Sequence, residues 1–496
     1  MKKSVTVIGG GLGGLSAAVS LAQEGYSVEV YEQNEHLGGK LNRLEKGGFG
    51  FDLGPSILTM PWIFEGLFEN SGKEMEEYIP LQRLETERRS FFSDGTVLDL
   101  MGDLEKMHKV NPNLSTSDMN EYQELLMYSR GLYELAEKGY FDKGIDTTWE
   151  VFKEHGMIGS LKGFDSFLTM QEAINERISN SHFQDMLGYF INYVGSSSYA
   201  APAILNMLIY MHHEQGAWYV PGGMHHIAEG IVRLAKEIGV TFHTGSKVVK
   251  MEEEDDLITA IVLADGTKVT SDLYVSNMEV IPVYEQLLKE DKKYTEKLTE
   301  KFEPAASGLV LFLGVKKEYP QLAHHNFFFS NDSKTNFETI FQKKQLPEDP
   351  TIYLVNVNKT DPGQGLPGHE NIKILAPVPY IQDDPFTQKD YEDLRERILV
   401  KLERMGLDGL RDNIVVEDMW MPQDIKENYS SYRGALYGTV SDKKKNHGFK
   451  HPKTSEKYDN LYFVGGTVNP GGSMAMVTLS GQQVRDKIVE REENEK

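Results

Sequence analysis

Residues 4–32 read SVTVIGGGLGGLSAAVSLAQEGYSVEVYE, and this stretch decides the fold. The β-branched run at its start predicts a short buried strand that ends in the glycine cluster 9–14. Apolar residues at helical spacing then predict a helix over 15–24, which Gly25 closes. Residues 27–32 predict a second strand. The stretch therefore predicts a compact strand–turn–helix–strand unit of an α/β protein.

The glycines follow the pattern Gly9-x-Gly11-x-x-Gly14 between the strand and the helix. Gly9 allows a tight turn, Gly11 lets the backbone approach a pyrophosphate, and Gly14 lets the helix pack closely on the strand. The helix N-terminus offers unpaired N–H groups to a phosphate. Glu32, at the end of the second strand, can accept hydrogen bonds from ribose hydroxyls and would repel the 2′-phosphate of NADP. The predicted dinucleotide contacts are Gly9, Gly10, Gly11, Leu12, Gly13, Gly14 and Glu32. A glycine-rich turn that binds nothing is the alternative.

Two further glycine-rich stretches are Gly38-Gly39-Lys40 and, at 461–472, LYFVGGTVNPGG. Together with FDLGPS at 51–56 they resemble the signatures of FAD-dependent amine oxidases and carotenoid desaturases. The resemblance implies FAD as the cofactor, with both ends of the chain in contact with it. It also implies a C-terminal helix that points its N-terminus at the flavin ring, since reduced flavin is anionic. The residues that the resemblance adds to the cofactor site are Gly39, Lys40, Val248, Gly466, Asn469, Gly471 and Gly472. The alternatives are an ordinary Gly-Pro turn and, for Val248, a buried strand residue.

The whole chain resembles the bacterial carotenoid desaturase/oxidase family of flavoproteins. Stretches that carry the resemblance include GFGFDLGPSILTMP at 48–61, YVGSSSY at 193–199, SNMEVIP at 276–282 and YPQLAHHNFFF at 319–329. It implies an α/β fold, in which an FAD-binding Rossmann-like domain of the amine oxidase/phytoene desaturase type joins a second, mixed-sheet substrate domain with a helical insertion. We expect the FAD domain to comprise residues 1–75, 216–285 and 455–496. We expect residues 76–215 and 286–454 to form the substrate domain, with a helical part that faces a membrane.

The same resemblance implies oxidation of terminal methyl groups on linear thirty-carbon carotenoids, to an aldehyde or a carboxylate, with dioxygen as the oxygen source. A carotenoid desaturase that acts on dehydrosqualene is the first alternative. We call the stretch at 461–472 the closing motif. The family's desaturases usually carry His-Pro-Gly in it, and this chain has Asn469-Pro470-Gly471. Because asparagine cannot transfer protons near pH 7 as histidine does, the exchange favours different chemistry over the same flavin. A prenyl-binding protein without redox activity, like the Rab GDP-dissociation inhibitors, is the second alternative. The sequence assigns no catalytic side chain.

Composition excludes several classes of site and partner. The chain has no cysteine, which removes disulfides, thiol nucleophiles and thiolate metal sites. Its 52 Lys+Arg against 75 Asp+Glu give a net charge of −23, which disfavours nucleic acid as a partner and makes any membrane contact mainly hydrophobic. The sequence shows no signal peptide or spanning helix. We therefore expect a cytoplasmic protein in peripheral contact with a membrane; the oligomeric state is not predicted.

Residues 186–211 contain no charged side chain. This segment predicts either domain core or the wall of a tunnel for a long apolar ligand, with Tyr189, Phe190, Tyr193, Tyr199 and Tyr210 as rings that suit a flat polyene.

Histidines occur in adjacent pairs, His212-His213, His225-His226 and His324-His325. Because neighbouring side chains are expected to point in different directions, we predict hydrogen-bonded histidines and no metal site.

Overall fold

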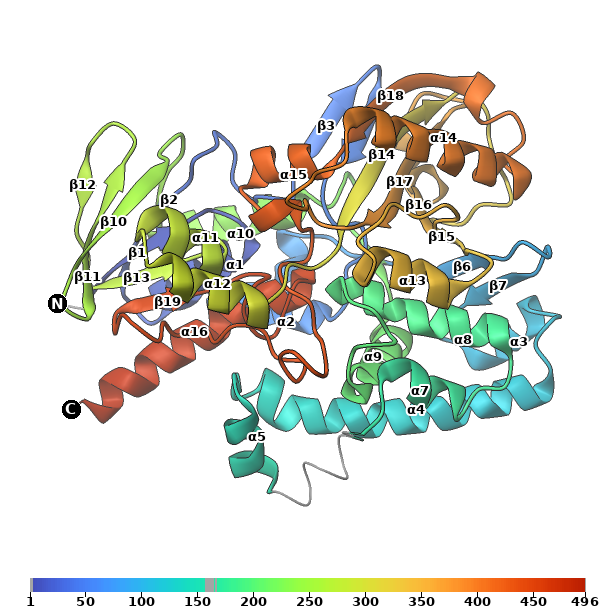
Figure 1. Ribbon diagram of the computed structural model, residues 1–496. Coiled ribbons are helices and arrows are strands. Elements are labelled where there is room, and N and C mark those ends of the chain that lie inside the picture. The colour runs from blue at the N-terminus through green and yellow to red at the C-terminus, as the bar shows by residue number, and fades with distance from the viewer. Residues whose placement is uncertain (1–2, 157–164, 166, 496) are drawn as a thin grey trace.

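Two sheets dominate the molecule, one of five parallel strands and one of seven mostly antiparallel strands (Figure 1). The protein is described here from a computed structural model, which covers residues 3–156, 165 and 167–495. The termini of the chain lie near each other beside the five-stranded sheet, and the helical insertion lies below the seven-stranded sheet in the view of Figure 1.

The five-stranded sheet contains the glycine-rich unit at its centre. Its order is β19-β13-β1-β2-β9, and every neighbouring pair is parallel. The strands are β1 (Ser4–Ile8), β2 (Ser27–Tyr31), β9 (Thr241–His243), β13 (Leu273–Ser276) and β19 (Leu461–Phe463). This confirms the strands predicted at 4–8 and 27–32. Parallel strands place all their carboxyl ends at one edge of the sheet, which is where α/β proteins of this type bind ligands.

Helices α1 (Leu12–Gln23) and α16 (Met474–Asn494) pack against each other on this sheet. The helix predicted at 15–24 thus begins earlier, at Leu12. The close packing depends on Gly481, because a Cβ atom there would lie 2.5 Å from the backbone nitrogen of Ala17. The two ends of the chain are therefore fixed together next to the glycine cluster.

A small antiparallel sheet adjoins the five-stranded sheet. Its strands are β10 (Val248–Glu254), β11 (Leu257–Leu263) and β12 (Lys268–Val269). A hairpin turn at Asp265-Gly266 joins the last two, with Gly266 at φ +89°. That backbone conformation favours glycine.

The seven-stranded sheet has the order β18-β14-β17-β16-β15-β6-β7. Its strands are β6 (Arg88–Phe91), β7 (Val97–Leu100), β14 (Ser307–Val315), β15 (His325–Phe328), β16 (Ile352–Asn356), β17 (Glu370–Val378) and β18 (Ile414–Trp420). Helix α14 (Gln388–Arg404) buries its apolar side chains against one face. The hairpin of β3 (Arg43–Lys46) and β4 (Phe49–Asp52) packs on this sheet through Phe49, Phe51 and Phe312.

The insertion is helical, as the family resemblance implies. It contains α3 (Leu104–Val110), α4 (Thr116–Ala136), α5 (Thr148–His155), α7 (Met170–Asn175) and α8 (Ser181–Gly188), and α9 (Met207–Gln215) packs along α4. Ser115 caps the N-terminus of α4 and forms a reciprocal capping box with Asp118. Within the described ranges, no helix combines the length and apolar character needed to cross a membrane.

The remaining elements connect these layers. They are the helices α2 (Pro61–Glu69), α10 (His226–Glu237), α11 (Val280–Pro282), α12 (Lys292–Lys301), α13 (Ser333–Phe341) and α15 (Pro422–Tyr429), and the short strands β5 (Gln82–Arg83) and β8 (Trp218–Tyr219).

The predicted two-domain division stays a prediction. The strands of the five-stranded sheet all come from the segments expected to form the FAD domain, and those of the seven-stranded sheet from the remainder. Residues 43–52, however, were placed in the FAD segments and pack on the seven-stranded sheet. Contacts therefore cross the predicted boundary.

Candidate active site

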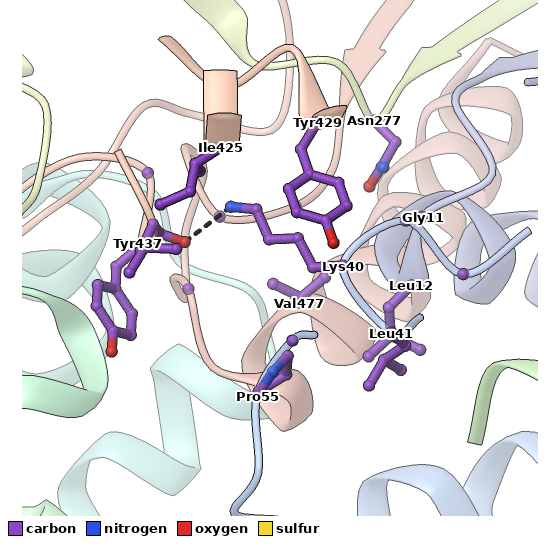
Figure 2. A pocket seen from close by; sticks show the side chains of 18 of the residues that line it. Gly11, Leu12, Lys40, Leu41, Pro55, Asn277, Ile425, Tyr429, Tyr437 and Val477 are labelled. Atoms are coloured by element: carbon purple, nitrogen blue, oxygen red, sulfur yellow. Dashed lines mark hydrogen bonds between the residues drawn. The ribbon is translucent and has the colours of Figure 1, made fainter. Parts of the chain in front are cut away.

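A cavity of about 500 Å³ runs between the glycine-rich edge of the five-stranded sheet and the seven-stranded sheet. Its volume is in the range of small-molecule and cofactor sites in proteins. Residues from both ends of the chain line it, and Figure 2 shows Gly11, Leu12, Lys40, Tyr429, Tyr437 and Val477 around it. The sites predicted separately from the N-terminal and C-terminal glycine motifs thus meet at one cavity.

The N-terminal turn forms one end of the cavity. Gly9, Gly11 and Leu12 line it, and α1 begins at Leu12, so that unpaired N–H groups of its first turn lie at this end. A Cβ atom on Gly11 would lie 2.5 Å from the side-chain nitrogen of Asn277, which also lines the cavity. Asn277 was not predicted as a site residue. Its Oδ1 accepts a hydrogen bond of 3.1 Å from the Gly14 N–H and so fixes the turn.

Gly10, Gly13 and Gly14 lie behind the lining. A Cβ atom on Gly14 would lie 2.1 Å from the carbonyl oxygen of Gly9, and one on Gly13 would lie 3.0 Å from the nitrogen of Gly465. A Cβ atom on Gly10 would meet Leu37 at 2.5 Å. These three glycines therefore permit close packing of the turn, and only Gly9 and Gly11 among the motif glycines face the cavity.

Glu32 lines the cavity and is only 6% exposed. Its Oε2 accepts a 2.7 Å hydrogen bond from the Gly10 N–H, and its Oε1 accepts a 2.9 Å hydrogen bond from the Asn34 N–H. Each carboxylate oxygen has a further lone pair for a ligand hydroxyl. The position at the end of β2, beside the glycine turn, is the one that the ribose role requires.

Lys40 supplies a buried amino group beside the turn. Its Nζ donates a 2.8 Å hydrogen bond to the carbonyl oxygen of Leu436 (Figure 2). Burial lowers the pKa of Lys40, and the nearby Glu279 carboxylate opposes this shift. Gly39 lines the cavity at φ +57° and brings its loop against Gly11, since a Cβ atom there would be 3.1 Å from the Gly11 Cα. Both predicted residues of this loop thus lie at the cavity.

The C-terminal motif forms a second helix N-terminus at the cavity. Gly466, Gly472, Ser473 and Met474 line it, and Met474 is the first residue of α16. The Ser473 hydroxyl accepts a hydrogen bond from the Met476 N–H and caps this helix. Val248, at the start of β10, also lines the cavity. The N-terminus of the C-terminal helix therefore lies at the cavity; its orientation toward a flavin ring stays a prediction.

Asn469 and Gly471 are not among the lining residues. Asn469 is fully buried, and its Oδ1 accepts hydrogen bonds from the Tyr140 hydroxyl and the Lys450 N–H. Its amide nitrogen donates to Asp146, which also forms a buried ion pair with Lys453. The cofactor contact predicted for these two residues has no counterpart in the cavity lining. Asn469 instead connects the loop that precedes α16 to the helical insertion. The residues of the C-terminal motif alone did not reveal this role.

The far end of the cavity is aromatic and apolar. Tyr193, Phe327, Tyr353, Leu375 and Tyr437 line it, mostly from the seven-stranded sheet. Of the five rings predicted to form a tunnel wall, only Tyr193 lines the cavity. The other four are Tyr189 and Phe190, which are buried in the core, and Tyr199 and Tyr210, which pack at its edge. The core interpretation is thus correct for most of 186–211, because successive residues of a helical segment point in different directions and only one face meets the cavity.

Lys373 is a lining residue that the sequence analysis missed. It lies between two isoleucines of β17, and its Nζ donates to the Ser56 hydroxyl at 2.9 Å and to the Gly54 carbonyl oxygen. Burial lowers the pKa of Lys373 to about 8, against the attraction of Asp52. The available signal was a lysine within the apolar run that starts at Ile372.

The histidine pairs are mostly hydrogen-bonded, as predicted. His212 is paired with the Tyr193 hydroxyl at 3.1 Å, and His325 with the Tyr353 hydroxyl at 2.9 Å. Burial lowers the pKa of both imidazoles well below 6.5. The expectation that neighbouring histidines diverge is wrong for His225 and His226, whose rings lie 4.1 Å apart and whose nitrogens lie within 4.8 Å of a Glu229 carboxylate oxygen. A helix start brings these side chains together, and His226 is hydrogen-bonded to Glu229 at 2.6 Å.

Comparison with known proteins identifies the family. Residues 12–488 match the family described as flavin containing amine oxidoreductase. The chain belongs to this family. As a flavin-containing amine oxidoreductase it is an FAD-dependent oxidoreductase, which confirms the cofactor and the fold expected from the two glycine motifs.

Relatives of this flavin oxidoreductase match it over nearly its whole length. The 4,4′-diaponeurosporene oxygenase of Staphylococcus aureus (strain USA300) is 56% identical, over 99% of both chains. That of Staphylococcus haemolyticus (strain JCSC1435) is also 56% identical, over 98% of this chain and 97% of the relative. A solved oxidoreductase from Methanosarcina mazei shares the fold, with a TM-score of 0.66 and 16% identity over 97% of this chain and all of the other.

The residues that line the cavity suit a dinucleotide such as FAD. Two helix N-termini and a half-buried lysine offer hydrogen-bond donors for phosphates at the cavity, and a strand-end carboxylate offers an acceptor for ribose hydroxyls. Glycine at positions 11 and 39 lets the Asn277 side chain and the two loops pack closely beside the cavity, since Cβ atoms there would lie 2.5 Å from the Asn277 side-chain nitrogen and 3.1 Å from the Gly11 Cα. Bound FAD supplies the two-electron redox chemistry, and the aromatic end of the same cavity is left for a substrate.

Proposed function

We propose that this protein is a carotenoid oxygenase that oxidises terminal methyl groups of linear thirty-carbon carotenoids, such as diaponeurosporene or diapolycopene, to an aldehyde or a carboxylate. One observation carries the proposal: a single cavity joins the FAD end to an aromatic, apolar chamber. The near full-length similarity to proteins named 4,4′-diaponeurosporene oxygenase supports the choice of substrate class. Dioxygen is the proposed source of oxygen.

The proposed cofactor contacts are those predicted from the sequence. Gly9, Gly11, Leu12, Glu32, Gly39, Lys40, Val248, Gly466 and Gly472 contact FAD from the lining, Gly10, Gly13 and Gly14 shape the turn, and Asn469 and Gly471 position the closing loop. The chamber residues hold the substrate. Flat rings such as those of Tyr353 and Phe327, stacked 4.7 Å apart, offer an apolar surface to a conjugated chain.

The chamber also explains why a terminal methyl group is a suitable target. Such a methyl is allylic, so charge that develops on its oxidation spreads over the conjugated chain. Burial of the polyene is favourable by roughly 25 cal/mol per Å² of apolar surface, so an extended apolar wall suffices to bind it. Tyr193, Phe327 and Tyr353 exclude water from the chain and leave its reacting end to the FAD side.

Product analysis tests the proposal. Cells that express this chain beside a thirty-carbon carotene pathway are expected to accumulate carotenoids with oxygen at a terminal carbon, detected by mass spectrometry and labelled by ¹⁸O₂. A variant without FAD serves as the control. Pigments that gain double bonds and no oxygen would identify a desaturase instead, and an unlabelled oxygenated product would exclude dioxygen as the source.

We propose further that the protein is cytoplasmic and contacts a membrane peripherally through its helical insertion. The uncharged segment 186–211 is largely buried and offers little surface to a membrane. Trp149 of α5, which is 75% exposed, and Phe167, which is 78% exposed, lie in the insertion instead. An apolar ligand extracted from a bilayer would enter most readily from such a surface.

The double variant Trp149→Gln, Phe167→Gln is expected to bind phosphatidylcholine vesicles several-fold more weakly than the unchanged protein, because two exposed apolar side chains lose their place in the lipid. Sedimentation with the vesicles measures this. Added salt should have little effect, since the net charge of −23 provides no broad attraction to lipid. Val400→Gln, an exposed apolar position on α14, is the matched control. Equal sedimentation of all three proteins would contradict the proposed surface.

A further inference from the structure

Arg88 places a buried positive charge at the aromatic end of the cavity. Arg88 is 1% exposed and lies on β6, the strand next to β15 in the seven-stranded sheet. It lines the cavity, and among the described residues it takes part in no ion pair within 4.0 Å. An isolated buried cation is costly, so a partner for it is expected in the functional state.

The hydrogen bonds of Arg88 leave most of its donors unused. Nη1 donates to the Met186 carbonyl oxygen at 3.3 Å and Nη2 to the Tyr193 hydroxyl at 3.5 Å, both longer than the usual 2.9 Å or so. Its Nε is buried without a hydrogen-bond partner. A guanidinium has five N–H donors, so the group can still bind an oxygen-bearing ligand.

Two rings restrict the direction from which such a ligand can approach. Phe190 and Phe327 lie over the guanidinium, with centroids 4.1 Å and 4.0 Å from Cζ. These contacts stabilise the charge but offer it no hydrogen-bond acceptor. The acceptor must therefore lie near the guanidinium plane, where carbonyl and carboxylate oxygens bind arginine best.

The neighbouring carboxyl does not provide this acceptor. Glu87 lies directly before β6, where its N–H continues the pairing with β7 by donating to the Leu100 carbonyl oxygen. Its side chain is directed to His212 and Arg83, at 3.3 Å and 3.4 Å. Successive side chains on a strand point to opposite faces. Burial also raises the pKa of Glu87 to about 8, so this group is largely neutral near pH 7.

We propose that Arg88 recognises the aldehyde or carboxylate oxygen at one end of a long conjugated ligand held in the aromatic chamber. This inference rests on the proposed function, because that reaction places such an oxygen on a carotenoid end. An apolar polyene gives Arg88 nothing to bind, whereas a ligand that carries one oxidised end satisfies it. Arg88 is then a specificity residue that favours oxygenated over hydrocarbon ligands and retains a partly oxidised chain in the site.

Equilibrium binding to the FAD-loaded protein without oxygen tests this. The probes are an all-trans thirty-carbon polyene monoaldehyde and the hydrocarbon with a methyl group in its place, and quenching of protein fluorescence gives each Kd. Arg88→Met is expected to raise the Kd of the aldehyde about tenfold or more, since a hydrogen bond to a charged group is lost. The Kd of the hydrocarbon should change less than twofold. Arg88→Lys should restore part of the aldehyde affinity.

The aldehyde absorption band provides a second measurement, which a purely structural role would not affect. Excitation of a polyene aldehyde moves electron density toward oxygen, so a cationic donor there shifts the band to longer wavelength. The shift should be present in the unchanged protein, absent in Arg88→Met and unaltered in Arg89→Met, whose arginine pairs with Asp99 instead. Equal weakening of both probes, or an unchanged aldehyde Kd and band, would overturn the role of Arg88. Failure of the unchanged protein to bind either probe would instead overturn the proposed function.

Discussion

The Gly11→Val variant will purify without FAD. A Cβ atom at this position would lie 2.5 Å from the Asn277 side chain, and both Gly11 and Asn277 line the cavity, so a valine distorts the lining at this turn. Because Asn277 also fixes Gly14, it cannot move away without loosening the turn. We expect the flavin absorbance near 450 nm to fall by an order of magnitude or more per mole of protein, and activity to fall with it.

A matched control separates loss of FAD from loss of the fold. Gly131 lies on the exposed side of α4, and a Cβ atom there would meet nothing within 4 Å, so Gly131→Val should keep its flavin. Circular dichroism should show the same secondary structure in both variants. Full flavin content in Gly11→Val would contradict the placement of FAD at the N-terminal turn.

Replacing Glu87 by glutamine will change how the stability of the protein depends on pH. Glu87 is buried, and burial raises its pKa to about 8 despite the opposing charges of Arg83 and Arg88. The folded state thus binds this proton more tightly than the unfolded chain, whose carboxyl titrates near 4.5. The contribution of Glu87 to stability is fully present below about pH 4.5 and is lost as the pH rises through about 8.

Glutamine resembles the protonated acid and does not titrate. One pKa unit corresponds to about 1.4 kcal/mol, so the stability of Glu87→Gln relative to the unchanged protein should rise by a few kcal/mol between pH 5 and pH 9. Urea denaturation of both holoproteins at several pH values measures the difference. The same substitution at Glu124, exposed on α4, is the control and should show little pH dependence. A difference between Glu87→Gln and the unchanged protein that is constant with pH would contradict the buried neutral state of Glu87.

The local parts of the cofactor site could be predicted because each depends on a short sequence. The Gly9–Gly14 turn, Glu32 and the second helix start need only strand, glycine and helix signals that neighbouring residues provide. The closing motif was less informative residue by residue. Gly466 and Gly472 line the cavity, but Asn469 turns toward Asp146 and Tyr140, which lie more than three hundred residues earlier in the chain.

The substrate end could not be predicted in the same way. Tyr193 was expected to line a tunnel, and Arg88, Lys373 and Asn277 were not expected to line anything. Arg88 sits in a sequence, RLETERRS, that looks like an ordinary charged surface segment. It is buried because β6 pairs with β15 and faces Phe190 and Phe327, residues far away in the chain.

By itself the sequence determined the strand–turn–helix unit and its dinucleotide turn, since glycine spacing and hydrophobic periodicity act over a few residues. The choice of FAD and the meeting of both chain ends followed from the family resemblance. Tertiary structure alone decided which side chains face the aromatic end of the cavity. It also decided that the Glu87 carboxyl is buried with a raised pKa and that Arg88 has no acidic partner within the part of the chain that the structure describes. The burial and ion pairing of a side chain depend on residues that the sheets bring together from distant parts of the chain. Neither can be read from the order of residues alone.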